Sequence, residues 1–381
     1  MTDEELHAHL IGRQGSRHDL NTPVLVIDRN ALKRNIARMA DFAAAQGVQL
    51  RPHSKTHKSP DIARLQVAAG AIGLCCAKIG EAEVLADAGL TGLLITSPVA
   101  SPPAIERLAA LNARSDGLMC VVDNPDNARA IAAAVRALGD RPLAVLIDID
   151  PGIHRTGVSS ADAAVALLNA IREDDTLRYA GVQYYCGMQQ HIEGYAEREA
   201  AIRERADYLR TIIAALTTAG GAPAIVTGGG TGTHRIDVTL GLFTELQVGS
   251  YVFMDDQYRA CALSADADEE VFESSLFIDT RVISNNTPGL ATVDAGLKAM
   301  ATDAGPAQIA TGAPEGARFI FMGDEQGALI VPPDHRFQLG DMVRLTAPHC
   351  DPTVNLYDNY HVVEGDTLEA IWPVAGRGRL R

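Results

Sequence analysis

The chain has 381 residues, of which 47% are hydrophobic and 21% charged, which suits a soluble globular protein of two domains. Its formal net charge of −15 argues against nucleic acid or an anionic membrane as a partner. No apolar run approaches the ~18 residues that cross a bilayer, and the polar first 20 residues carry no apolar signal segment. The six cysteines show no CxxC spacing, so we expect reduced thiols in a cytoplasmic protein.

The first two-thirds of the chain alternate between strand and helix patterns. An arm over residues 1–21 is followed by a predicted strand at 22–28 and a helix at 30–46. Eight short apolar strand segments separated by helices then follow, at 48–52, 71–77, 92–97, 117–122, 142–148, 179–185, 224–227 and 245–248. Such strands are buried on both faces of a parallel sheet. Eight units of about 25 residues favour a (β/α)8 barrel over its competitor, a doubly wound open sheet.

The pattern changes after about residue 255. A polar, acidic segment at 262–270 is typical of a surface loop, and short β-rich runs separated by turn residues follow it. These runs are 273–283, 291–293, 317–322, 328–331, 342–347, 360–363 and 367–372. We therefore expect an arm and strand at 1–28 that pairs with a β domain, a barrel at 29–255, and the all-β domain itself at 256–381.

A cluster of basic residues occupies the junction after the first barrel strand, at 51–58. Strand alternation puts Arg51, His53 and Lys55 on one side. Chemistry in a parallel barrel takes place at the carboxyl ends of its strands. A lysine there that is buried or lies near other cations can lose its proton, and an unprotonated amine condenses with carbonyls. The alternative interpretation is a solvated basic loop.

Three further candidates follow the fifth and sixth strands. Arg155 lies in the glycine-containing segment 148–158 and is suited to binding a phenolate or carboxylate, although it could be a surface arginine. Tyr185 ends the sixth strand and His191 follows it. Histidine transfers protons near neutral pH, so a role in catalysis competes here with a role as a helix cap or surface group.

Glycine-rich segments follow the seventh and eighth strands. Glycines allow backbone N–H groups to converge on an anion, and the last two strand ends of barrels commonly hold a phosphate. The alternative is a pair of flexible turns. The candidate phosphate-binding residues are Thr227, Gly229, Gly230, Thr231, Gly249, Ser250 and Tyr251.

A candidate metal site lies in the second domain, at 348–358. If residues 345–351 are extended, His349 and Asp351 project to one side and Cys350 to the other. One imidazole and one carboxylate suit a divalent ion such as Mn²⁺ or Mg²⁺. The alternative is a capped turn in which Cys350 is a small core residue.

Together, the segments 51–58, 148–158, 184–191 and 348–358 resemble those of the D-threonine aldolase and D-serine dehydratase family, and most closely the D-threonine aldolases. These pyridoxal-phosphate enzymes are related to the alanine racemase barrel. The resemblance implies that Lys55, rather than Lys58, carries the cofactor as an imine. It also implies that Tyr185 lies beside the cofactor ring and His191 near the metal and the substrate hydroxyl. Family aldolases have a His-x-Asp metal pair, whereas the dehydratases use cysteine and zinc.

The expected function is therefore cleavage of D-3-hydroxy amino acids, such as D-threonine, to glycine and an aldehyde. We expect a homodimer that acts on small molecules with pyridoxal phosphate and Mn²⁺ or Mg²⁺, with Zn²⁺ as the alternative ion. Alternatives are a D-serine dehydratase, a D-3-hydroxyaspartate aldolase, an amino-acid racemase and a non-catalytic cofactor-binding protein. The chain departs from the family pattern at Ala77, Gly80, Ser97 and Gln326, and these departures bear on substrate identity.

Overall fold

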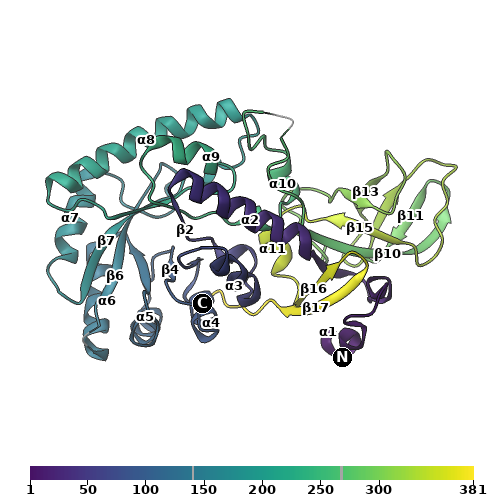
Figure 1. The fold of residues 1–381 in the computed structure, drawn as a ribbon, viewed down its shortest axis with the longest axis horizontal. Coiled ribbons are helices and arrows are strands. Elements are labelled where there is room, and N and C mark those ends of the chain that lie inside the picture. Colours follow the sequence, from purple (N-terminus) through teal and green to yellow (C-terminus); the bar gives the residue numbers. More distant parts are fainter. Residues whose placement is uncertain (140, 267–268) are drawn as a thin grey trace.

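The structure is a computed structural model that describes residues 1–139, 141–266 and 269–381. Figure 1 shows an elongated molecule with a barrel at one end and a second sheet at the other. The carboxyl terminus returns to the barrel, whereas the amino terminus lies beside the second sheet. Part of the surface loop predicted at 262–270 lies outside the described residues.

The barrel contains eight parallel strands in the order β2-β9-β8-β7-β6-β5-β4-β3. A bridge between His53 and Cys75 joins the two ends of this order, so the sheet curls into a ring. The barrel fold is confirmed, and the doubly wound alternative is wrong. The strands are β2 (Gln49–Leu50), β3 (Cys75–Cys76), β4 (Leu94–Ile95), β5 (Met119–Val122), β6 (Leu143–Ile149), β7 (Leu177–Tyr184), β8 (Ile225–Gly228) and β9 (Glu245–Leu246).

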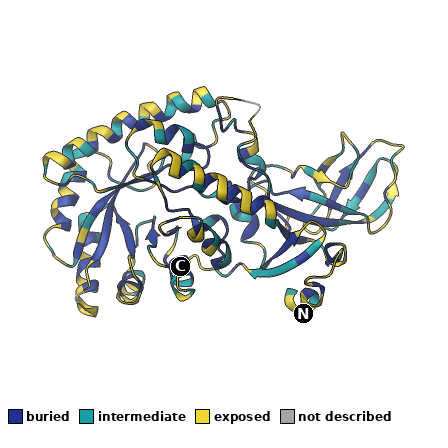
Figure 2. Cartoon of the chain, viewed as in Figure 1, coloured by how far each residue is buried: buried dark blue, intermediate teal, exposed yellow. Residues whose placement is uncertain are grey.

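The barrel helices pack their apolar sides on the strands and turn their polar sides to solvent, as Figure 2 shows by burial. Prolines at the first positions of α3, α5 and α6 start these helices without losing a hydrogen bond. The helices are α2 (Arg29–Gln46), α3 (Pro60–Ala68), α4 (Ile79–Asp87), α5 (Pro102–Arg114), α6 (Pro125–Leu138), α7 (Ala161–Ile171), α8 (Tyr195–Thr218) and α9 (His234–Asp237). None of the described helices is long and apolar enough to span a membrane.

The second sheet has nine strands and is mostly antiparallel. Strand β1 (Val24–Asp28) lies inside it, antiparallel to β10 and parallel to β16. Strand β12, at residues 309–311, is absent from the sequence-based expectation. The remaining strands are β10 (Leu276–Thr287), β11 (Leu290–Val293), β12 (Ile309–Thr311), β13 (Arg318–Phe321), β14 (Gly327–Ile330), β15 (Met342–Thr346), β16 (Asn359–Glu364) and β17 (Thr367–Pro373).

The amino-terminal arm packs on the second sheet through two buried polar contacts. Arg17 makes a two-pronged ion pair with Asp279 of β10, at 2.7 and 2.8 Å. His7, the last residue of α1 (Asp3–His7), contacts His361 of β16, with 2.8 Å between Nδ1 and Nε2. Arg17, Asp279 and both histidines are each at most 2% exposed.

A short helix, α11 (Cys350–Val354), brings the second sheet to the barrel mouth, and Figure 1 shows it between the two parts. The N–H of Cys350 donates to the carboxylate of Asp255, which also accepts from the N–H of Tyr258 in α10 (Asp256–Arg259). The hydroxyl of Tyr360 donates to the carbonyl of His57, at 2.6 Å. These buried contacts fix α11 against the carboxyl ends of the barrel strands.

Candidate active site

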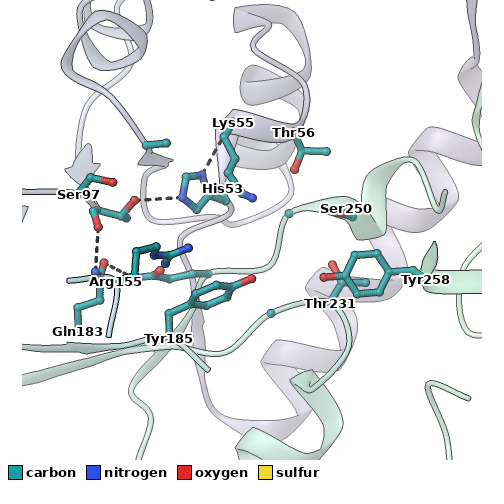
Figure 3. Close-up of a pocket in the computed structure, with 15 residues that line it drawn as sticks. His53, Lys55, Thr56, Ser97, Arg155, Gln183, Tyr185, Thr231, Ser250 and Tyr258 are labelled. Atoms are coloured by element: carbon teal, nitrogen blue, oxygen red, sulfur yellow. Dashed lines mark hydrogen bonds between the residues drawn. The ribbon is translucent and has the colours of Figure 1, made fainter. Parts of the chain in front are cut away.

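A cavity of about 200 Å³ opens at the carboxyl ends of the barrel strands. It brings together seven of the predicted site residues: Lys55, Arg155, Tyr185, Gly230, Thr231, Gly249 and Ser250. The other residues that line it are His53, Thr56, Ala77, Thr96, Ser97, Gln183, Gln247 and Tyr258. Figure 3 shows Lys55 reaching toward this space, with Arg155 and Tyr185 across from it.

Lys55 is positioned by His53, which sequence analysis places in the basic cluster but not in contact with the lysine backbone. Strand β2 leads into the 3-10 turn η3 (Ser54–Thr56), and Nδ1 of His53 accepts the N–H of Lys55 at 3.3 Å. Because Nδ1 is an acceptor, the neutral ring carries its proton on Nε2 and donates it to the hydroxyl of Thr96, at 3.1 Å. Burial, and then the charge of Lys55, lower the pKa of His53 to about 3, so the imidazole stays neutral.

The amine of Lys55 forms an ion pair with Asp351 of α11, with 2.8 Å between Nζ and Oδ2. Asp351 raises the pKa of Lys55 well above its ordinary value. Burial alone would raise the pKa of Asp351, but the charge and hydrogen bond of Lys55, together with His349 and Thr56, outweigh burial and lower it. The expectation that neighbouring cations deprotonate Lys55 is therefore wrong for the free protein, since Arg51 pairs with Glu245 instead.

The second lysine of the motif, Lys58, is only 7% exposed and points away from the cavity. Its amine pairs with Oε1 of Glu81 at 3.0 Å, and the other oxygen of Glu81 accepts the N–H of Ala77. Lys58 is therefore part of a buried structural ion pair. This geometry supports the choice of Lys55 as the residue that holds the cofactor.

Arg155 presents a positive charge to the cavity without an acidic partner among the described residues. Its guanidinium carbon lies 5.8 Å from the centroid of the Tyr185 ring. The segment that carries it is fixed by Asp148, which accepts from the hydroxyl of Thr156 at 2.7 Å. Burial raises the pKa of the Tyr185 phenol, so this hydroxyl remains protonated. Arg155 is therefore available to bind an anionic group of a ligand.

A cluster of small polar residues forms one side of the cavity. Figure 3 places Thr56, Ser250 and Thr231 together there. The hydroxyl of Thr56 is buried and has no partner at hydrogen-bond distance in the described part of the chain, although it is near enough to Asp351 to help lower the pKa of that carboxyl. A Cβ at Gly249 would come within 2.8 Å of this hydroxyl, so only glycine fits the turn. An orphaned hydroxyl beside a close-packed glycine turn is the kind of site that a phosphate fills.

Three other predicted phosphate ligands do not line the cavity. Thr227 is buried and accepts from the amide of Gln247 at 3.1 Å, and the hydroxyl of Tyr251 accepts from Gln66 at 3.0 Å. Gly229 has a φ of +67° and packs against Asp237. The structure gives these residues scaffold contacts behind the cavity wall.

The metal-binding segment differs from its expected conformation. The predicted extended run through residue 351 is wrong, because β15 ends at Thr346 and α11 starts at Cys350. The cause is Pro352, which is tolerated in the first turn of a helix and cannot donate to a strand. His349 precedes the helix, and Asp351 faces Lys55. Cys350 is fully buried, and its thiol donates to Oδ1 of Asp351 at 3.5 Å.

His191 is brought to the same end of the cavity by a separate loop. Its ring stacks against Tyr258, which lines the cavity, with 4.5 Å between centroids. Burial, and then the charges of His349 and Lys55, lower the pKa of His191, which favours a neutral imidazole. His191, His349 and Asp351 therefore lie close enough to interact electrostatically, although two distant segments supply them, and Lys55 comes from a third.

Four departures from the family pattern lie in different surroundings. Ala77 and Ser97 line the cavity, whereas Gln326 lies in the turn between β13 and β14. A Cβ at Gly80 would come within 2.7 Å of the carbonyl of Arg381, so glycine lets the carboxyl-terminal tail pack on α4. Of the four departures, only those at Ala77 and Ser97 lie where a ligand in the cavity could contact them.

Residues 27–257 match the family described as the alanine racemase N-terminal domain, and residues 275–363 match a putative serine dehydratase domain. The chain belongs to the D-threonine aldolase and D-serine dehydratase family. The expected family is therefore confirmed, and it is a family of pyridoxal-phosphate enzymes with the alanine racemase fold.

Three relatives of this family span nearly the whole chain. A 3-hydroxy-D-aspartate aldolase from Paracoccus denitrificans (strain Pd 1222) is 36% identical over 95% of this chain and 93% of the relative. A D-threonine aldolase from an Arthrobacter species is also 36% identical, over 95% of this chain and 94% of the relative. The crystal structure of D-threonine aldolase from Filomicrobium marinum has a TM-score of 0.91 and 38% identity, over 96% of this chain and 98% of that one.

Proposed function

We propose that this protein is an aldolase that cleaves D-3-hydroxy amino acids to glycine and an aldehyde, with pyridoxal 5′-phosphate and a divalent metal ion. The observation that carries the proposal is the 2.8 Å pair between Lys55 and Asp351, with His191 and His349 close to both. The surroundings of Lys55 thus offer an amine for the cofactor next to candidate metal ligands and a candidate base.

The cavity residues fit the cofactor. Lys55 would hold it, Arg155 has no competing acid and suits its phenolate, and Tyr185 flanks the space for its ring. The phosphate suits the side where Thr56 has its unpartnered hydroxyl, next to Gly230, Thr231, Gly249 and Ser250. When bound, pyridoxal phosphate supplies an electron sink for the carbanion left at the substrate Cα.

The ligand set fits a hard or borderline divalent ion. Asp351 is held by Lys55 in the free protein, and it loses that partner once the amine is bonded to the cofactor. Its carboxylate, together with Nε2 of His349, is then available for Mn²⁺ or Mg²⁺. A bound cation lowers the pKa of a hydroxyl that it contacts.

His191 is the candidate base. Its imidazole is neutral because burial and nearby cations lower its pKa. It would take the proton of the substrate 3-hydroxyl as the Cα–Cβ bond breaks, since a neutral imidazole has a free lone pair. Tyr258 packs against this ring at a tilt, with 4.5 Å between the ring centroids.

The second metal ligand favours an aldolase over a dehydratase. The carboxylate of Asp351, rather than a thiolate, pairs with Lys55, and the buried thiol of Cys350 donates to the other oxygen of Asp351 at 3.5 Å. A thiolate site would favour zinc, the ion of the dehydratase alternative. A racemase would not require the His349 and Asp351 pair.

We further infer a cytoplasmic homodimer. All six cysteines are buried and unpaired, which supports a reducing compartment. The cavity is open to solvent beside α11, and a two-fold partner would cover it. Light scattering at assay concentration tests this inference, since a fully active monomer would contradict it.

The deciding experiment compares products. Purified protein with pyridoxal phosphate and manganese is given D-threonine, D-serine or D-3-hydroxyaspartate, with L-threonine as the stereochemical control. We expect glycine and an aldehyde from the 3-hydroxy substrates of the D series. Release of pyruvate from D-serine without glycine from D-threonine would instead make the dehydratase the better assignment.

A further inference from the structure

We propose that Asp303 is a positioning residue that orients His349 for metal binding, an inference that rests on the proposed metal site. The carboxylate oxygen Oδ2 of Asp303 lies 2.7 Å from Nδ1 of His349, across 46 residues of sequence. Asp303 lies in the connection between β11 and β12. It does not line the cavity, so it would act through His349 alone.

The hydrogen bond selects the ring nitrogen that can bind a metal. An ionised carboxylate only accepts hydrogen bonds, so Nδ1 of His349 carries the proton. The lone pair of the neutral ring is then on Nε2, at the other edge of the imidazole. Metal-binding histidines commonly donate their second nitrogen to a carboxylate, which fixes the ring and makes it a better ligand.

The connection that carries Asp303 is anchored on the same helix as the metal ligands. The N–H of Ala301 donates to the hydroxyl of Thr353, at 3.0 Å, and that hydroxyl donates to the carbonyl of His349, at 2.7 Å. The hydroxyl of Tyr357 donates to the carbonyl of Ala299, at 2.7 Å. The carboxylate therefore reaches His349 from a rigid support.

A purely structural role for this pair is a poor explanation. The side chain of Asp303 is 54% exposed, and exposed ion pairs contribute little to folding. His349 also acts electrostatically on both His191 and Asp351, so its ring lies among the groups proposed for catalysis. A contact that matters little for folding but fixes this ring is better explained by ligand positioning.

Manganese binding to the pyridoxal-phosphate-loaded protein tests the inference, with free Mn²⁺ measured by electron paramagnetic resonance. Asp303→Ala should weaken Mn²⁺ affinity about 10- to 100-fold. Asp303→Asn should lose less Mn²⁺ affinity, because its amide oxygen can still accept a hydrogen bond from Nδ1–H of His349. Glu315→Gln, which changes an exposed carboxylate of the same part of the chain, should bind Mn²⁺ like the wild type. Activity of Asp303→Ala should return at saturating Mn²⁺.

The outcomes separate this inference from the proposed function. If the wild type binds Mn²⁺ and Asp303→Ala binds it equally well, the positioning role is overturned while the metal site stands. If the wild type binds no divalent metal, the metal site and the role of Asp303 both fall. Thermal unfolding of each variant checks that lost affinity is not lost folding.

Discussion

Lys55 of the barrel and Asp351 of α11 form an ion pair, with 2.8 Å between Nζ and Oδ2. Asp351 raises the pKa of Lys55. Lys55, together with His349 and Thr56, outweighs burial and lowers the pKa of Asp351. The free protein therefore keeps the amine protonated and the carboxylate occupied. If Lys55 holds the cofactor and Asp351 the metal, as proposed, loading the cofactor and freeing Asp351 for the metal would be coupled.

The first prediction concerns Asp351→Asn, which removes the charge but keeps the shape. The pKa of Lys55 should fall, because its main stabilising charge is gone and burial opposes protonation. Reductive methylation of the cofactor-free protein across a pH series, read out by mass spectrometry, should show Lys55 reacting at lower pH than in the wild type. Unchanged reactivity would mean that Asp351 does not control the amine. Lys33, an exposed lysine on α2, is the internal reference.

A second prediction separates the two lysines of the motif. Borohydride should fix the cofactor on Lys55, and Lys55→Ala should abolish visible absorbance. Its cost in stability should be smaller than that of losing Lys58, because Lys55 and Asp351 are more exposed than Lys58 and Glu81. Lys58→Met should retain the cofactor but lose about 3–5 kcal/mol of unfolding free energy, because it leaves Glu81 charged and buried without its partner. Denaturant titration measures that loss. A reduced adduct on Lys58 would reverse the assignment.

Much of this architecture could be predicted because it follows from local patterns. The eight apolar barrel segments and the β-rich runs after residue 270 carry their own periodicity, and all eight barrel strands lie where expected. The end of β15 is not predictable in the same way. The alternation of side chains predicts that the strand continues into a segment that Pro352 makes helical. Strand β12 is three residues long with an exposed end, so its pattern is weak.

Site residues that directly follow a strand can be predicted from the sequence. Contacts between residues of distant segments cannot. Lys55, Arg155 and Tyr185 were found by their strand-end positions. Gln183 and Gln247 were missed, although a polar residue within an apolar strand was a usable signal for the barrel interior. The contact of Asp303 with His349 joins residues 46 positions apart, and no local pattern indicates it.

A third prediction concerns Arg198, which holds the loop of His191. Its buried guanidinium donates to the carbonyls of Ile192, Glu193 and Ala262 and has no acidic partner among the described residues. Arg198→Met should release this loop and lower kcat by up to about 100-fold, since small misplacements of a base are costly. Arg198→Lys should recover part of the rate, because an ammonium reaches some of the same carbonyls.

The matched control for this prediction is Arg203→Met on the same helix. The side chain of Arg203 is half exposed and pairs with Glu199, so its loss should change kcat little. Equal effects of the two substitutions would show that helix α8 matters only for stability. The absorbance of the cofactor should stay unchanged in all three variants.

A fourth prediction concerns pH and the arm. Burial, and then the neighbouring His7, lower the pKa of His361 from 6.5 to about 4, and burial also lowers that of His7. The unfolded chain then binds more protons than the folded chain below about 6.5. The stability contributed by this pair is therefore fully present above pH 6.5 and is lost as the pH falls toward about 4, by about 3 kcal/mol for His361.

Urea unfolding at several pH values between 7 and 4 measures this loss. His361→Gln should flatten the dependence, because glutamine does not titrate. His18→Gln changes an exposed histidine of the same arm and should leave the dependence as in the wild type. Asp3 and the Arg17–Asp279 ion pair lie near His7 and His361 and also respond to low pH. The pH dependence of the wild type must therefore be compared with that of His361→Gln. If His361→Gln lost stability with falling pH as steeply as the wild type, the loss would belong to the carboxylates of Asp3 and Asp279.

The last prediction separates aldolase from dehydratase through the metal ligands. A chelator should abolish cleavage and leave the cofactor absorbance intact, because the ion would contact the substrate hydroxyl and not the cofactor ring. Asp351→Ala should do the same.

Asp351→Cys should shift metal preference toward zinc, since a thiolate is the softer ligand. Cys350→Ala should change Mn²⁺ affinity little, because its thiol makes only a weak contact with Oδ1 of Asp351, at 3.5 Å, and its N–H, which the substitution keeps, donates to Asp255. If Cys350→Ala removed the metal and Asp351→Ala did not, the side chains around α11 would be arranged differently and the dehydratase would become the better hypothesis.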